Sequence, residues 1–311
     1  MKQKEKVFVV VNPTSGGGAG HRLWPEAAKE LRKRVGTFDS EETTAIGHAQ
    51  YLAADAANAG YTLVIAYGGD GTVHEVVNGL MEGRTPEKPA LGILCTGTGG
   101  DFVKSLQLPG DLNDQVRIAC GTKSRRIDLG QIRFVNATNE EETRYFVNIA
   151  SCGLSADVVR RTPRYRSMLG RKPAYLAATL DSYLHWSPKR ITISTEHGTL
   201  ANWPATPTTV VVANGKYFGG GMPIAPGADL SDGYFDLVSV DKIPAYQVPL
   251  FLSLLYSRQI HRMKRVHHDR VRKVYLSSDG RVDLDIDGEA LGSLPASFEI
   301  FPSALEVRTP T

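Results

Sequence analysis

The sequence predicts an α/β protein of two domains: a doubly wound domain with a parallel sheet, followed by a domain that is mainly antiparallel β-sheet. Three observations support this fold class. At 311 residues the chain is longer than a typical single domain. Its first 130 residues alternate apolar runs with amphipathic runs. The remainder contains short β-branched and aromatic runs separated by Gly, Pro, Asn and Asp, which is typical of antiparallel sheets.

In the first domain, hydrophobic periodicity separates strands from helices. Strands are expected at 7–11, 62–67 and 90–95, and helices at 21–35, 47–60, 73–81 and 101–108. The strand segments are almost entirely apolar, which favours a parallel sheet covered by helices on both faces. Ligands of such sheets bind beyond the carboxyl ends of the strands, so we expect a functional site there.

In the second part of the chain, short strands predominate and helices are few. Strands are expected at 144–151, 190–195, 208–215, 233–240, 272–278, 281–286 and 296–301, and helices at 174–186 and 245–260. The texture changes near Asp128, which predicts domains at 1–128 and 129–311. Residues from about 296 to 311 can pack back on the first domain in this prediction.

Charge and cysteine content exclude several classes of protein. The net charge of +3 is too small to indicate a nucleic-acid-binding protein. Cys95, Cys120 and Cys152 are odd in number and lack CxxC spacing, which favours a reducing cytoplasm over a disulfide framework. The N-terminus has no signal-peptide pattern, and the apolar run at 248–256 is too short to span a bilayer.

Three glycine-bearing loops, at 12–20, 68–72 and 97–101, each follow an apolar strand. Because parallel strands end at one edge of the sheet, the backbone N–H groups of these loops can converge on one polyphosphate. The chain lacks both GxxxxGK[ST] and GxGxxG with a distant acid, which disfavours P-loop NTPases and Rossmann dehydrogenases. Asp70 in the second loop then suggests a magnesium ligand; the alternative is a cap for the following helix.

These motifs together resemble the diacylglycerol kinase catalytic-domain family. The resemblance is carried by NPTSG at 12–16, GGDGTVHEVVNGL at 68–80, GTGGDF at 97–102, RRIDLG at 125–130, PIAPGADLSDGYFDLV at 223–238 and DGE at 287–289. This family includes bacterial diacylglycerol kinases, sphingosine kinases and ceramide kinases, and it shares its nucleotide fold with NAD kinases. The resemblance implies an ATP-binding α/β domain and a β-sandwich domain that binds the lipid. It also implies that the γ-phosphate of ATP is transferred, with Mg²⁺, to the hydroxyl of diacylglycerol or a related lipid alcohol.

The resemblance assigns site residues in the first domain. The residues implied to bind ATP and its Mg²⁺ are Asn12, Ser15, Gly16, Thr43, Gly68, Gly69, Asp70, Gly71, Thr72, Val73, His74, Gly97, Thr98, Asp101 and Asp128. Helix capping by Asp101 and a strand ion pair of Asp128 with Arg125 or Arg126 are the alternatives for those two acids. Gly100 stands where many members have Asn, and His74 replaces an asparagine common in bacterial members.

The resemblance also assigns two sites in the second domain. One corresponds to a structural magnesium loop, with Asp232 as the side-chain ligand, the backbone carbonyls of Asp229 and Tyr234 beside it and waters completing an octahedron; a plain turn between strands is the alternative. Asp287 and Glu289 correspond to the source of a general base. We expect Glu289 to be the base and Asp287 to support it, because the longer side chain reaches further; a structural β-turn is the alternative.

Two basic stretches, 160–172 and 258–273, predict peripheral contact with an anionic membrane, with solvated surface as the equal alternative. His261, His267 and His268 are interpreted as surface residues. Alternative functions are a sphingoid-base kinase, a soluble NAD kinase-like enzyme and an inactive module that binds anionic lipid. The oligomeric state stays open, a homodimer included.

Overall fold

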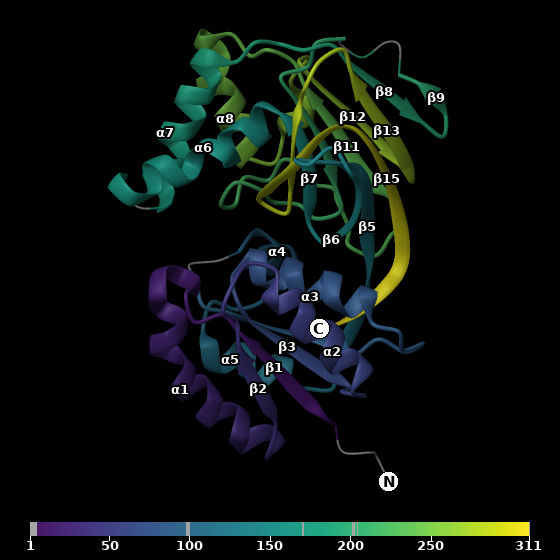
Figure 1. Ribbon diagram of the computed structural model, residues 1–311. Coiled ribbons are helices and arrows are strands. Elements are labelled where there is room, and N and C mark those ends of the chain that lie inside the picture. The colour runs from purple at the N-terminus through teal and green to yellow at the C-terminus, as the bar shows by residue number, and fades with distance from the viewer. Residues whose placement is uncertain (1–4, 98–99, 170, 201–202, 204, 311) are drawn as a thin grey trace. The chain divides into compact units, whose positions relative to one another are not determined.

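The computed structural model describes residues 5–97, 100–169, 171–200, 203 and 205–310 (Figure 1). Its contacts divide the chain into two units, Met1–Leu129 with Pro302–Thr311, and Gly130–Phe301. The sequence placed the division near Asp128 and allowed the C-terminal segment to join the first domain. By its contacts, the segment after Phe301 is grouped with the first unit.

The first unit contains a parallel sheet. Its strands are β1 (Val7–Val11), β2 (Asp39–Glu42), β3 (Leu63–Gly68) and β4 (Ala90–Cys95), in the order β2-β1-β3-β4, and the end of β15 (Glu289–Arg308) lies beside β4. All four pairings are parallel. Its helices are α1 (Ser15–Val35), α2 (His48–Asn58), α3 (Asp70–Glu82), α4 (Asp101–Ser105) and α5 (Leu112–Ala119).

Helices cover both faces of this sheet, which confirms the doubly wound prediction. On one face, Leu31 of α1 and Val116 of α5 join a buried cluster with the strand residues Val9, Ile65 and Leu94. Helices α2 and α3 pack against each other and against β1, β3 and β4. Alternate residues of each strand serve the two faces, so the strands are apolar along their length.

Two elements of this unit were missed from the sequence. Strand β2 reads DSEE and is exposed at every residue, because it is an edge strand held only by β1. Helix α5 starts at the N-cap Asp111, whose side chain accepts the N–H of Asp114. Within α1, the glycines at 16–18 have positive φ angles, so regular helix starts close to the expected residue 21.

The second unit is a sandwich of antiparallel strands. One layer has the order β12-β11-β10-β7-β14-β15; β13, β8 and β9 extend from β15 on one side, and β5 and β6 on the other. The strands are β5 (Ser124–Asn136), β6 (Glu141–Phe146), β7 (Ile149–Gly153), β8 (Ile191–Thr195), β9 (Gly198–Thr199), β10 (Thr209–Ala213), β11 (Phe235–Val240), β12 (Val266–Val271), β13 (Lys273–Ser278) and β14 (Asp283–Ile286). A core that includes Phe146, Phe235 and Phe298 lies between the layers. The predicted antiparallel β-sandwich is confirmed.

The helices of the second unit gather at one end of the sandwich (Figure 1). They are α6 (Leu154–Leu169), α7 (Arg171–His185) and α8 (Val248–Tyr256), with 3₁₀ turns at Ala245–Gln247 and Ile260–Arg262. One continuous helix over 245–260 is therefore wrong: Pro249 lies in the first turn of α8, and Arg258 adopts a φ of 61° that ends it. Among the described helices, none combines the length and apolarity needed to cross a bilayer.

Candidate active site

Asn12 joins the first two glycine loops of the first unit. Its backbone N–H donates to the carbonyl of Tyr67 at 2.9 Å, and its side-chain amide donates to the hydroxyl of Thr72 at 2.9 Å. A Cβ atom at Gly68 would lie 2.3 Å from that hydroxyl oxygen, so only glycine permits Thr72 to pack there. The first turn of α3 is therefore held against the end of β1.

Ser15 joins the first loop to the third. Its hydroxyl oxygen lies 2.6 Å from that of Thr96, and the Thr96 N–H donates to the carbonyl of Gly68 at 3.1 Å. Gly16 has a φ of +62°, and a Cβ there would lie 2.7 Å from the Thr96 carbonyl oxygen. All three loops thus contact one another at the carboxyl edge of the parallel sheet. Thr96 was not singled out from the sequence, although it directly follows β4.

The remaining residues of the predicted nucleotide set differ in position. Thr43 follows β2 at the same edge, and its N–H donates to the carbonyl of Val11 at 2.7 Å. The side chains of Val73 and His74 are buried one turn into α3. Thr98 lies outside the described residues.

Glu75 is a structural residue that sequence reasoning missed. Its carboxylate accepts the N–H groups of Gly47 and Ala49 at 2.9 and 3.0 Å, at the start of α2. An acid satisfies the orphan amides and the positive end of a helix dipole. Glu75 on α3 therefore fixes the start of α2, close in sequence to Thr43.

Asp70 connects the second loop to the third. Helices α3 and α4 begin at Asp70 and Asp101, but their N-caps are Gly69 and Gly100, and neither cap makes a side-chain capping bond. Asp70 Oδ2 instead accepts the backbone N–H of Asp101 at 3.1 Å. A Cβ atom at Gly100 would lie 2.0 Å from Asp70 Oδ1. The carboxylate thus occupies the space that the missing side chain leaves.

Asp128 lies on β5 and is almost fully buried. Its Oδ1 accepts the N–H of Ser303 at 2.7 Å, while the Arg126 guanidinium donates to the Ser303 carbonyl at 2.9 Å. Asp128 and Arg126 thus bind the N–H and the carbonyl, respectively, of the same residue, Ser303 on β15. The proposed orientation of magnesium by Asp128 remains a prediction.

This donor set fits a nucleotide with magnesium. Glycine-rich loops and helix starts present backbone N–H groups to phosphate, and Mg²⁺ is bound through one or two carboxylates together with phosphate oxygens. Asp70 and Asp101 supply such carboxylates at neighbouring helix starts. Across the described parts of the chain, no cluster of three or more His, Cys, Asp or Glu side chains could hold a metal ion alone. A Mg²⁺ ion at Asp70 and Asp101 would take its other ligands from phosphate oxygens and water.

In the second unit, Asp287 and Gly288 form the two-residue turn between β14 and β15. Their φ angles are 50° and 90°, and positive φ at both positions is typical of a type I′ hairpin turn. The Asp287 carboxylate accepts three consecutive backbone N–H groups at 2.9–3.0 Å, those of Val147, Asn148 and Ile149. Asp287 is therefore an anchor of the turn, and Glu289 is the first residue of β15 after it.

Asp285 and Ser151 lie behind this turn, and neither was singled out from the sequence. Asp285 is only 5% exposed; its Oδ2 accepts the Ser151 hydroxyl at 3.1 Å and its Oδ1 accepts the Gly288 N–H at 2.9 Å. Burial raises the pKa of Asp285 to about 7, and the neighbouring Asp287 and Glu289 carboxylates act in the same direction. The alternating acids of DLDIDGE are the signal that could have found it.

At the predicted magnesium loop of the second unit, the side chains of Asp229 and Asp232 bind other groups of the protein. Asp229 Oδ1 accepts the N–H of Ser231 at 3.0 Å, and Asp232 Oδ1 accepts the N–H of Tyr234 at 3.0 Å. The other oxygen of Asp232 pairs with Arg270. Burial raises the pKa of Asp232 despite this guanidinium. A cation at Asp232 has to compete with Arg270, so the structural metal remains a prediction.

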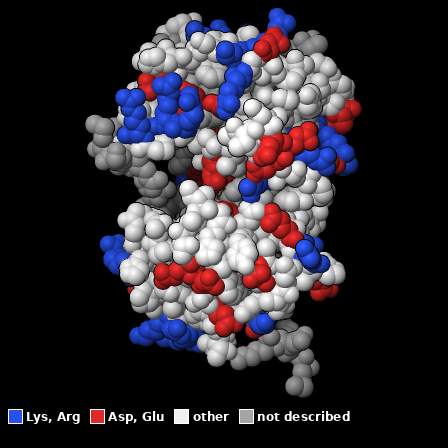
Figure 2. Space-filling view, in the orientation of Figure 1, with Lys and Arg blue, Asp and Glu red and all other residues white. Residues whose placement is uncertain are grey.

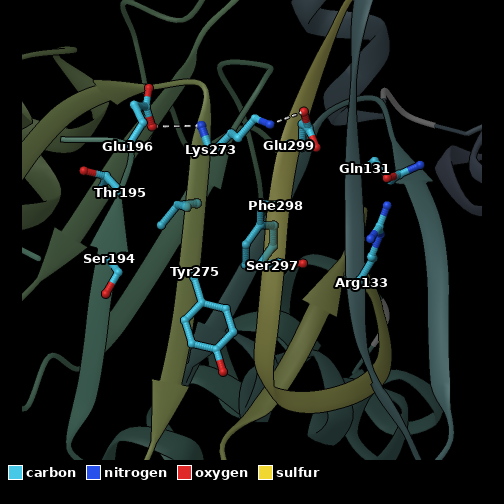
Figure 3. Close-up of a pocket in the computed structure, with 11 residues that line it drawn as sticks. Gln131, Arg133, Ser194, Thr195, Glu196, Lys273, Tyr275, Ser297, Phe298 and Glu299 are labelled. Atoms are coloured by element: carbon cyan, nitrogen blue, oxygen red, sulfur yellow. Dashed lines mark hydrogen bonds and ion pairs between the residues drawn. The ribbon is translucent and has the colours of Figure 1, made fainter. Parts of the chain in front are cut away.

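A separate pocket of about 320 Å³ lies on strands β5, β8, β13 and β15 (Figure 3). Lys273 and Glu299 line it and form an ion pair at 2.7 Å, and Arg133 and Tyr275 also line it. It contains none of the residues that the sequence assigned to a site. It is therefore distinct from the residues of the candidate active site.

Two known domain families match the chain. The diacylglycerol kinase catalytic domain matches residues 6–132, and the YegS C-terminal NAD kinase beta sandwich-like domain matches residues 148–309. A diacylglycerol kinase of Staphylococcus epidermidis is 29% identical over 311 residues, covering 99% of this chain and 93% of the relative. A diacylglycerol kinase of Staphylococcus saprophyticus is 28% identical over 310 residues, with coverages of 99% and 96%.

Solved structures share the same fold. A diacylglycerol kinase from Bacillus anthracis superposes with a TM-score of 0.78 at 22% identity, covering 99% of this chain and 98% of the other. Yeast NADH kinase complexed with NADH gives a TM-score of 0.50 at 11% identity, with coverages of 100% and 85%. Both similarities concern the fold alone.

Proposed function

Because this chain belongs to the diacylglycerol kinase catalytic-domain family, we propose that it is a lipid kinase that uses ATP and Mg²⁺ to phosphorylate diacylglycerol or a related lipid alcohol. The observation that carries the proposal is the linkage of three glycine loops at one sheet edge. The Asn12–Thr72 and Ser15–Thr96 hydrogen bonds make that linkage.

The nucleotide is proposed to lie along these loops, with its phosphates at the starts of α3 and α4. Backbone amides there favour negative charge, and no conventional P-loop lysine is required. Magnesium, when bound, neutralises charge on the phosphates. Asp70 and Asp101 are the residues proposed to hold it, and the amide of Asp101 fixes the orientation of the Asp70 carboxylate.

The acceptor hydroxyl has to lose a proton as the phosphoryl group is transferred. Phosphoryl transfer depends mainly on positioning and charge stabilisation, and a carboxylate base adds to the rate. We assign the base to Glu289, because the Asp287 carboxylate is engaged by three backbone amides. This contact pattern favours support by Asp287 over direct proton transfer, in keeping with the role expected for each residue.

The proposed membrane contact has support from apolar residues that the basic stretches did not indicate. On α7, Leu184 is 79% exposed, and on α8, Leu250 is 55% exposed and Tyr256 is also exposed. Lys and Arg side chains gather on the part of the second unit where Figure 1 places α6 and α8 (Figure 2). An apolar helix with flanking cations suits the surface of an anionic bilayer.

Part of the predicted basic surface is instead committed to ion pairs within the protein. Arg160 pairs with Asp157 and Asp283, and Arg161 pairs with Asp157 and Asp181. Charge from α6 is therefore partly neutralised. The docking surface that we propose is the exposed side of α8 with the cations that follow it.

In the second basic stretch, two histidines have carboxylate partners. His267 lies 3.4 Å from Asp241, and His268 lies 2.6 Å from Asp236. These pairs form because β12 lies beside β11, which no local spacing in the sequence could indicate. His261 is exposed, as expected.

The test is phosphorylation of purified lipids in mixed micelles with radiolabelled ATP, read by chromatography of the products. Diacylglycerol, a sphingoid base, a monoacylglycerol and NAD are offered in parallel. We expect label in diacylglycerol, and we expect Asp70→Asn to lose at least about 10²-fold in turnover with an unchanged melting temperature. Label in NAD alone, or in no acceptor, would contradict the proposal.

A further inference from the structure

We propose that Asp285 is a positioning residue for the Asp287–Glu289 turn, holding its backbone from behind and supporting the proton transfer made there. This inference rests on the proposed function, because it assigns Asp285 a role toward the proposed base. No motif assigns it. The carboxyl group reaches the turn through Gly288 and reaches β7 through Ser151.

The turn is held at both of its central N–H groups. The N–H of Asp287 donates to the carbonyl of Ile149 at 2.8 Å, and the N–H of Gly288 donates to Asp285 Oδ1 at 2.9 Å. In the sheet, Asp285 lies opposite Ser151, and the pairing of β14 with β15 is irregular between Leu284 and Asp285. The irregularity therefore coincides with the carboxyl group that binds the turn.

Two carboxyl groups thus act on the turn in different ways. Asp287 projects from it and binds the amides at 147–149, whereas Asp285 lies behind it and binds its Gly288 amide. Both contacts restrain the backbone that leads into Glu289. A base has to be placed within hydrogen-bond reach of its proton, so this rigidity bears directly on the rate.

The groups that face Asp285 bear on whether its carboxyl group has a functional or only a structural role. The groups that face it are the Ser151 hydroxyl from β7 and the carboxylates of Asp287 and Glu289. Arg160 on α6 pairs with Asp157 and Asp283. An asparagine could accept the same N–H bond without a buried charge. Because the pKa of Asp285 is raised to about 7, this group carries negative charge near Glu289 only above that pH, and there the charge strengthens the neighbouring carboxylate as a base.

The experiment compares Asp285→Asn and Asp285→Ala with wild type in the micelle assay from pH 5 to pH 9. We expect Asp285→Ala to lower kcat by about 10²-fold with little change in KM for ATP, because the turn loses its support. We expect Asp285→Asn to recover much of this loss below pH 7, where Asp285 holds its proton, and to have a lower kcat than wild type above about pH 7, where only wild type carries the additional charge near Glu289. Asp283→Asn and Asp283→Ala, on the same strand, are the matched controls and should leave the profile unchanged.

A second measurement separates function from stability. The raised pKa of Asp285 means that the folded state holds a proton that the unfolded state releases, so wild type loses stability as the pH rises from about 4 to about 7. Asp285→Asn should escape that loss and melt at a higher temperature than wild type at pH 8. Higher stability combined with an altered rate profile is the result that a purely structural role cannot produce.

The outcomes are distinguishable from failure of the proposed function. If wild type phosphorylates lipid and Asp285→Asn has an unchanged profile, the inference is overturned and the proposed function stands. If wild type phosphorylates no lipid, both fall together. If Asp285→Ala does not fold, the Asn variant still decides, because it retains the acceptor for the Gly288 N–H.

Discussion

Glycine at position 100 has a physical role in the contact between the second and third glycine loops. Its backbone φ of −61° is open to any residue, so strain does not require glycine there. The space for a side chain is taken by the Asp70 carboxylate. The rotamer of Asp70 therefore depends on the absence of a side chain at position 100.

We predict that Gly100→Ala displaces the Asp70 carboxylate and lowers turnover by up to about 10²-fold, with a melting temperature close to that of wild type. The flexible end of the Asp70 side chain can move at little cost in stability, whereas its proposed role in holding magnesium requires the carboxylate to keep its position. Gly110→Ala is the matched control, because no atom lies within 4 Å of a Cβ there. Equal turnover of the two variants would show that Asp70 does not depend on this space.

At the scale of elements, the β14–β15 hairpin gives different surroundings to Asp287 and Glu289, which lie two residues apart in the sequence. Asp287→Asn should lower stability by about 1.5–3 kcal/mol, because an amide nitrogen cannot accept the backbone N–H bonds that the carboxylate oxygens accept. Glu289→Gln should leave stability nearly unchanged and lower turnover by about 10²–10⁴-fold while ATP affinity is kept.

Denaturant melts and steady-state kinetics on the same preparations measure both effects. Comparison is made per folded molecule, so that loss of stability does not count as loss of chemistry. If Asp287→Asn, corrected in this way, is the more damaging variant and removes the acid limb of the rate profile, the base is Asp287. If both variants keep full turnover, the hairpin has only a structural role.

Helix α8 is the element on which the membrane proposal depends. Replacing Leu250 and Leu252 together with Ser should weaken binding to vesicles of phosphatidylglycerol and phosphatidylcholine by at least about tenfold, because each leucine contributes apolar area to the bilayer. Ile46→Ser is the control, since that side chain is 95% exposed on the first unit. Co-sedimentation with vesicles measures the binding.

The charges next to α8 allow a second comparison. Reversing Arg262, Lys264 and Arg265 should weaken binding to anionic vesicles at low salt and have little effect on neutral ones. Equal binding of wild type to both kinds of vesicle would argue against an electrostatic contribution. Unchanged binding of the leucine variant would exclude α8 as the docking element.

For the whole molecule, the prediction concerns a cation that stabilises the second unit at Asp232. If it does, EDTA should lower the melting temperature in the absence of nucleotide, and Asp232→Ala should abolish this response. Arg270→Met should increase the effect of EDTA on the melting temperature, because the guanidinium that pairs with Asp232 is removed. Melting curves that do not change with Mg²⁺ in any of the three proteins would assign Asp232 to its ion pair alone.

Much of this organisation was accessible from the sequence. The apolar strands β1, β3 and β4 were found almost to the residue, because a strand buried on both faces is apolar throughout. The three glycine loops and their place at one sheet edge followed from the same pattern. Strand β2 escaped, because an exposed edge strand buries no apolar residue and therefore has no periodicity to detect.

Only the tertiary structure decided which polar groups meet. Thr96 lies beside Ser15, Glu75 binds the start of α2, Asp285 binds the hairpin turn, and Arg270 pairs with Asp232. Most of these partners are far apart in the sequence, so no local pattern indicates the contacts. Hydrophobic periodicity reports the burial of one element at a time. A hydrogen bond between distant residues depends on how whole elements pack. The fold and its loops could therefore be predicted from the sequence, whereas the partners of the acidic residues could not.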